Sequence, residues 1–168
     1  MNPSPGKDFE DRLRSRLEGV RRLAIIGIGD EFMPADSIGM SAAREIGKIG
    51  LPGVKVFLAG TVPESVTGPI RTYRPDHVLM VDAADMGAGP GTLAIVEPGS
   101  ITANLFSTHY FPLSVVMEYL SQDEGTKVIL VGIQPDNEVH CDGLSPRERE
   151  ALRNLIDSLT SILGSRHS

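Results

Sequence analysis

The sequence predicts a three-layer α/β/α sandwich built on a five-stranded, twisted and mostly parallel sheet. Short apolar, β-branched runs recur along the chain, and segments with helical spacing and capping residues separate them. The runs expected to form strands are residues 23–28, 54–59, 77–81, 93–96 and 128–133. Because 168 residues suit one domain, we expect a single domain over residues 22–164, an N-terminal extension (1–21) and a short tail (165–168).

Helices are expected between these strands and at both ends of the chain. Asp36 or Ser37 can cap one of them, and the last helix has the clearest start, with Ser145 as the cap and Glu148 completing a capping box. The charged segment 8–19 is a further helix candidate, with a partly ordered extension as the alternative. The other expected helical ranges are 37–49, 112–120 and 145–163, with a broken helix after residue 64.

The fourth strand is expected to run antiparallel to its neighbours. The segment 83–92 that leads into it is short and rich in glycine. A parallel connection needs about a dozen or more residues and usually contains a helix. The short connection therefore predicts one antiparallel strand in an otherwise parallel sheet.

Charge and composition exclude several classes of function. The formal net charge of −6 provides no basic patch, so nucleic-acid binding is not expected. No apolar run approaches the ~18 residues of a membrane span, and the N-terminus lacks the apolar stretch of a secretory signal. The one cysteine, Cys141, can form no internal disulfide and fits a reducing compartment. We therefore expect a cytoplasmic protein without membrane insertion, and we separately expect it to be a monomer.

Acidic and polar residues gather where the predicted strands end. In open α/β sheets, functional sites lie beyond the carboxyl ends of the strands. Asp36, Asp82 and His109 follow three different strands and combine two carboxylates with an imidazole. The other residues expected near this rim are Asp30, Glu31, Thr61, Glu64, Asp85, Glu97, Gln134 and Asp136.

Three kinds of site fit these residues to different degrees. Nucleotide binding is weakly supported, because Gly27 and Gly29 follow a strand but Phe32 stands where a dinucleotide motif has its third glycine. An aspartic dyad would need Asp36 and Asp82 to share a proton and activate water. Metal ligation by two carboxylates and one imidazole suits zinc or nickel and leaves positions open for substrate. Spacing does not decide between the last two.

Ordinary structural roles also fit the same residues. Asp36 can simply cap its helix, and His109 can be a polar loop residue. Asp82 is harder to explain in this way, because its apolar neighbours indicate burial and a buried carboxylate needs a partner. The adjacent His140 and Cys141 are better explained as part of an exposed polar loop than as a second metal site.

Five short, separated segments carry a further signal. They are GIGD (27–30) with DSIG (36–39), GTVPE (60–64), VDAADMG (81–87) with PG (90–91), STH (107–109) with PL (112–113), and GIQP (132–135). In this order they resemble the hydrogenase maturation endopeptidases, which remove a C-terminal extension from the large subunit of nickel–iron hydrogenases. The similarity spans about residues 23–163, and the last three segments most resemble the branch that serves formate-hydrogenlyase-type hydrogenases.

The resemblance implies that Asp36, Asp82 and His109 contact a metal centre, with Asp36 and Asp82 also catalytic in an aspartic-type endopeptidase. The metal would be nickel supplied by the substrate, the precursor of the hydrogenase large subunit, and zinc or cadmium could occupy the site in vitro. The residues expected to contact the substrate are Thr61, Glu64, Asp85 and Gln134. A non-catalytic checkpoint or chaperone protein that binds the nickel-loaded subunit is the alternative.

Two positions depart from the pattern of the family that the chain resembles. Asp30 stands where that family often has asparagine, which changes the hydrogen bonding expected in its loop. Ala35 stands where the family often has a second acid. The second departure leaves Asp36 as the matching ligand without a competing neighbour.

Overall fold

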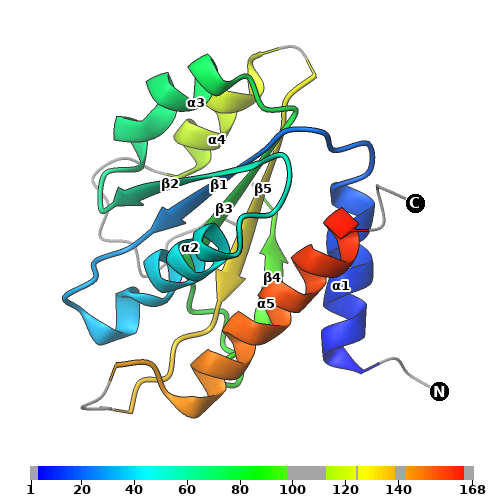
Figure 1. Ribbon diagram of the computed structural model, residues 1–168. Coiled ribbons are helices and arrows are strands. Elements are labelled where there is room, and N and C mark those ends of the chain that lie inside the picture. Colours follow the sequence, from blue (N-terminus) through cyan, green and yellow to red (C-terminus); the bar gives the residue numbers. More distant parts are fainter. Residues whose placement is uncertain (1–3, 98–112, 124, 139–142, 165–168) are drawn as a thin grey trace.

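The computed structural model describes residues 4–97, 113–123, 125–138 and 143–164, which form a five-stranded sheet with helices on both faces (Figure 1). In chain order the elements are α1 (Pro5–Arg16), β1 (Leu23–Ile28), η1 (Pro34–Asp36), α2 (Ile38–Ile49), β2 (Val54–Gly60), η2 (Pro63–Val66), α3 (Thr67–Tyr73), β3 (His77–Ala83), β4 (Leu93–Val96), α4 (Leu113–Ser121), β5 (Lys127–Ile133) and α5 (Pro146–Gly164). The predicted fold class is confirmed.

The strand order of the sheet is β2-β1-β3-β5-β4. Four strands are parallel, and β4 pairs with β5 in the antiparallel direction, as the short glycine-rich connection predicted. The end of β3 differs from the sequence prediction. Strand β3 continues through Asp82 to Ala83 because these residues still pair with Gly132 and Ile133 of β5. Asp82 therefore belongs to a buried strand and not to the loop that follows it.

The two faces of the sheet carry separate apolar layers. Helices α1, α2 and α5 cover one face, and α3 and α4 cover the other (Figure 1). Strand β1 is buried on both sides: Leu23 and Ile25 face the first layer, while Ala24 and Ile26 face the second. Such burial is typical of central parallel strands, whose two faces are both covered by helices. No helix among the described residues has the length and apolar character needed to cross a membrane.

The N-terminal segment forms a helix that packs on this core. Helix α1 starts at Pro5, three residues before the predicted start, and the Ser4 hydroxyl accepts a hydrogen bond from the Lys7 N–H. Its apolar stripe places Phe9 and Leu13 in the layer shared with α2 and α5. Helix α1 also lies beside β4 at the edge of the sheet (Figure 1). The buried stripe explains why a segment of such charged sequence is ordered.

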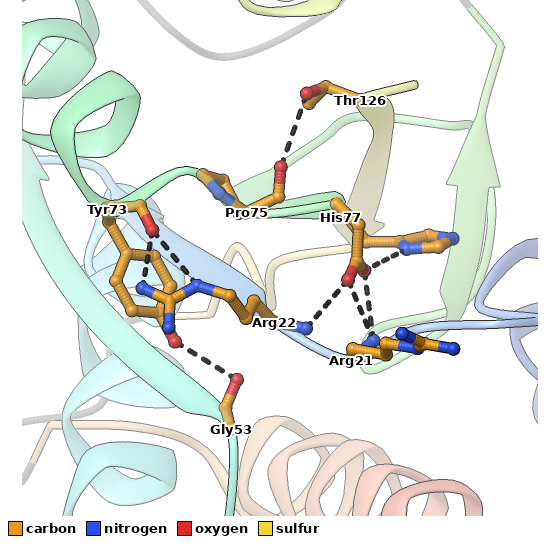
Figure 2. A network of polar contacts seen from close by, with 8 residues as sticks. Arg21, Arg22, Gly53, Tyr73, Pro75, His77 and Thr126 are labelled. Atoms are coloured by element: carbon orange, nitrogen blue, oxygen red, sulfur yellow. Dashed lines mark hydrogen bonds and ion pairs between the residues drawn. The ribbon is translucent and has the colours of Figure 1, made fainter. Parts of the chain in front are cut away.

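A network of hydrogen bonds around Asp76 links the starts of β1 and β3 at the amino edge of the sheet (Figure 2). Its carboxylate accepts hydrogen bonds from the backbone N–H groups of Arg21 and Arg22 just before β1 and from Nδ1 of His77 at the start of β3. The Arg22 guanidinium in turn donates to the carbonyl of Tyr73 and lies over its ring. Partial burial raises the pKa of Asp76, but the bonds from His77 and the two N–H groups outweigh this effect and hold the pKa below its usual value.

We expect Asp76→Ala to lower the free energy of unfolding by about 2–3 kcal/mol, because several donors lose a charged acceptor at once. A carboxylate with a lowered pKa stabilises the fold above its unfolded pKa, and this stabilisation disappears as the pH falls through the folded pKa. The difference between wild type and variant should therefore shrink in acid. Urea unfolding at pH 7 and pH 3.5 measures it. Asp123→Ala is the control, because its exposed ion pair with Arg71 should contribute less than about 1 kcal/mol.

Candidate active site

Asp82 is the most unusual side chain at the carboxyl edge of the sheet. It is fully buried in β3, and neither carboxylate oxygen has a hydrogen-bond partner of normal geometry among the described residues. Burial raises its pKa well above the usual value, the nearby charge of Asp36 raises it further, and the backbone N–H of Ala83 opposes these effects. Binding of a cation or a proton to this carboxylate would be favourable, because no other group in the described part of the chain compensates its negative charge.

Asp36 belongs to a loop that folds back on itself before α2. It ends the short 3-10 turn η1 and is buried, and its Oδ2 accepts a hydrogen bond of 2.9 Å from the backbone N–H of Asp30. Ser37, and not Asp36, takes the N-cap position of α2. The carboxylate of Asp36 thus joins the two ends of the loop and lies near enough to Asp82 to raise the pKa of its carboxyl group.

Two glycines bring the loop and the helix close to the strands. A Cβ atom on Gly39, in the first turn of α2, would overlap the carbonyl oxygens of Ile28 and Val81 and lie 3.1 Å from the Cα of Asp82. Gly29 has a φ of +138°, and a Cβ atom there would overlap the carbonyl oxygen of Asp36. Glycine at both positions allows this approach. Gly29, one of the two glycines considered for nucleotide binding, therefore has a packing explanation, which sequence spacing did not reveal.

The four predicted substrate contacts lie at the same edge but in different surroundings. Thr61 and Glu64 are exposed on the segment after β2, and Asp85 is exposed after β3. Gln134 is buried: its Oε1 accepts from the backbone N–H of Met86 at 2.6 Å, and its Nε2 lies 3.3 Å from Oδ1 of Asp85. Gln134 thus holds the glycine-rich loop after β3 in place. The contact of these residues with substrate stays a prediction.

Other residues predicted for the rim lie elsewhere or outside the description. Because β4 runs antiparallel, Glu97 leaves it toward the amino edge of the parallel strands, where it pairs with Arg16 of α1. Placing Glu97 on the rim was therefore wrong. His109, the third predicted ligand, and the pair at His140 and Cys141 lie outside the described residues. Among the residues that the structure does describe, no three histidine, cysteine or acidic side chains are grouped to hold a metal ion.

Comparisons with known proteins agree on one family. The family model for hydrogenase maturation proteases matches residues 40–162. The chain is 36% identical over 114 residues to the hydrogenase 3 maturation protease of Escherichia coli K12, covering 67% of this chain and 72% of that protein. It is also similar to the crystal structure of the nickel–iron hydrogenase maturation protease HycI from Thermococcus kodakarensis KOD1. That match has a TM-score of 0.78 at 30% identity and covers 91% of this chain and 99% of the other.

A more distant structure supports the fold alone. The hydrogenase maturating endopeptidase HybD of E. coli has a TM-score of 0.69 at 23% identity, covering 86% of this chain and 93% of that one. Together with the family model, these similarities confirm the resemblance that the five sequence segments indicated.

We expect Asp82→Asn to stabilise the protein at neutral pH and to have little effect near pH 4. A folded pKa raised above the unfolded value makes ionisation unfavourable for folding. The penalty begins as the pH rises past the unfolded pKa of about 3.9 and grows until the folded pKa is reached. Asparagine cannot ionise, so the melting temperature of the Asp82→Asn variant should exceed that of wild type by about 3–6 °C at pH 7.

Thermal unfolding from pH 4 to pH 8 measures this difference. Asp157→Asn, the same change at an exposed position on α5, is the matched control and should show no such trend. A melting-temperature difference for Asp82→Asn that stays constant over this pH range would contradict the explanation by buried charge.

Proposed function

The chain belongs to the hydrogenase maturation protease family, and from this premise we propose that it removes the C-terminal extension of a nickel-loaded hydrogenase large subunit. The observation that carries this proposal is the buried carboxylate of Asp82, which has no hydrogen-bond partner of normal geometry among the described residues and lies near the carboxylate of Asp36. Such a pair suits a cationic centre presented by the substrate. No resident cofactor is required, because the nickel is part of the substrate.

Recognition would depend on the metal that the precursor carries. Asp36 and Asp82 supply two carboxylates, and His109 would supply an imidazole. This donor set suits borderline divalent ions, and three protein ligands leave positions for the substrate's own ligands. A precursor without nickel would leave the buried charge of Asp82 uncompensated, so its complex would be weaker. Zinc or cadmium would occupy the same three side chains in vitro.

Hydrolysis would use one of the carboxylates as an acid and base, as in an aspartic-type endopeptidase. The raised pKa of Asp82 makes its carboxylate a better proton acceptor than an ordinary aspartate. A water oxygen would bond to the scissile carbonyl carbon as its proton passes to a carboxylate. That proton would then reach the leaving nitrogen as the C–N bond breaks. The nickel of the substrate, when bound nearby, can polarise the carbonyl.

The remaining expectations follow from the same site. The partner is the precursor of the large subunit, processed by one copy of this chain in the cytoplasm. Thr61, Glu64 and Asp85, which are exposed after β2 and β3, would contact the peptide, and Gln134 keeps the loop of Asp85 in place. A checkpoint protein that binds the loaded precursor without cutting it would use the same ligands, so cleavage itself must be measured.

We expect Asp36→Asn, Asp82→Asn and His109→Ala each to reduce processing by at least about 100-fold, the usual contribution of an acid or base, while the fold is kept. Asparagine preserves the shape of aspartate and an oxygen that can accept the Asp30 N–H, but it loses the charge. Mass spectrometry of nickel-loaded precursor incubated with each variant reports cleavage. Asp157→Asn and His140→Ala are the matched controls. A fully active Asp36→Asn variant would remove Asp36 from the site.

We expect nickel-free precursor to resist cleavage and to bind at least about tenfold more weakly than the loaded form, because Asp82 then lacks a cation. Isothermal titration with the two forms measures binding, and the mass shift measures cleavage. Equal cleavage of both forms would reject metal recognition and favour a plain aspartic dyad. Tight binding of loaded precursor without any cleavage would favour the checkpoint function.

A further inference from the structure

We propose that Phe32 and Met33, at the tip of the loop between β1 and α2, anchor the protease to an apolar surface patch of the folded large-subunit precursor. The proposal rests on the proposed function and adds a docking surface to it. Phe32 is 95% exposed and Met33 is 56% exposed, so the loop presents both side chains to solvent. Two adjacent large apolar residues with this exposure are typical of a surface that a protein partner covers.

The loop is held in one conformation by its own hydrogen bonds. The N–H of Asp30 donates to Oδ2 of Asp36, and Oδ1 of Asp30 accepts from the N–H of Phe32, both at 2.9 Å. The N–H of Met33 donates to the carbonyl of Asp30, and the N–H of Asp36 donates to the carbonyl of Met33. The apolar tip is therefore organised before binding, which lowers the entropy lost when a partner docks.

The same loop carries a residue of the active site. Asp36 ends the segment that begins at Asp30, so the loop directs a carboxylate inward and Phe32 outward. The loop protrudes as the light-blue segment at the lower left of Figure 1, where β1 ends. Asp36 follows Met33 by three residues in the same loop, so the exposed apolar tip lies close in the chain to the carboxylate at which cleavage is proposed.

The segment that follows β2 begins beside this loop and carries another exposed apolar residue. The N–H of Gly29 donates to the carbonyl of Gly60 at 2.8 Å, so the segments after β1 and β2 leave the sheet side by side. Val62 follows on the second segment and is 45% exposed. Phe32, Met33 and Val62 together are called the apolar rim below.

The charge of the surroundings favours the precursor over a second copy of this chain. Asp30 and Glu64 lie on the two segments that carry the apolar rim, and the net charge of the chain is −6. A symmetric dimer through the apolar rim would bring these carboxylates face to face with their copies. The repulsion disfavours such a dimer and also an anionic membrane surface. A precursor that presents a cationic metal centre beside an apolar patch complements both features.

Steady-state processing of nickel-loaded precursor by Phe32→Ser and Phe32→Ser/Met33→Ser variants tests the proposal. We expect KM to rise about tenfold for the single variant and more for the double variant, with kcat nearly unchanged, because anchor residues contribute to binding. Phe32→Leu should recover most of the affinity. Ile49→Ser is the control, since Ile49 is 46% exposed at the end of α2, just before β2 starts and hence at the other edge of the sheet.

Direct binding of the loaded precursor to each variant separates this inference from the proposed function. If wild type processes the precursor and Phe32→Ser does so with the same KM, the docking role is wrong and the protease function stands. If wild type binds but does not cut, weaker binding by Phe32→Ser still supports docking, while the protease function fails. Absence of binding by wild type, or equal loss of affinity in Ile49→Ser, overturns the docking role.

Discussion

The site depends on the close approach of the first turn of α2 to strands β1 and β3. At Gly39, any side chain larger than hydrogen would meet the carbonyl oxygens of Ile28 and Val81, so the helix would have to move away from the sheet. Asp36 lies just before this turn, and its position is fixed by the same approach and by its bond to the Asp30 N–H. The electrostatic coupling between Asp36 and Asp82 is thus a consequence of backbone packing as well as of charge.

This packing makes the ionised form of Asp82 destabilising for the protein when no ligand is bound. A buried carboxylate without a normal hydrogen-bond partner among the described residues opposes folding when ionised, and the neighbouring Asp36 increases that effect. The large apolar layers on the two faces of the sheet offset it. Instability confined to one strand end is typical of functional sites, because the partner that relieves it is the ligand.

The sequence was sufficient for the fold, and the site residues that it predicted stay a prediction, although the structure places Asp36 and Asp82 near each other. Apolar runs identified all five strands, and the short glycine-rich connection gave the direction of β4. The end of β3 was missed because it depends on pairing with Ile133, about fifty residues further along the chain. Glu97 was misplaced because the reversal of β4 had not been carried through to the residue that follows it.

Side-chain roles that depend on neighbours in the folded structure could not be predicted from the sequence either. Gln134 was predicted to contact substrate, and its hydrogen bonds to the loop after β3 follow only from the fold. The packing roles of Gly29 and Gly39 likewise need the positions of Asp36 and Val81 in space. Local patterns report which face a residue takes, while contacts between distant segments decide what it touches there.

The network around Asp76 has a consequence for how members of this architecture can diverge. It ties the starts of β1 and β3 together at the edge of the sheet opposite Asp82 (Figure 2). The stabilising network and the two aspartates of the proposed site thus lie at opposite edges of the sheet. Exposed positions of the segment between β1 and α2, such as Phe32, can accumulate substitutions while the network around Asp76 keeps the strands aligned. Partner choice can then evolve faster than the scaffold that supports it.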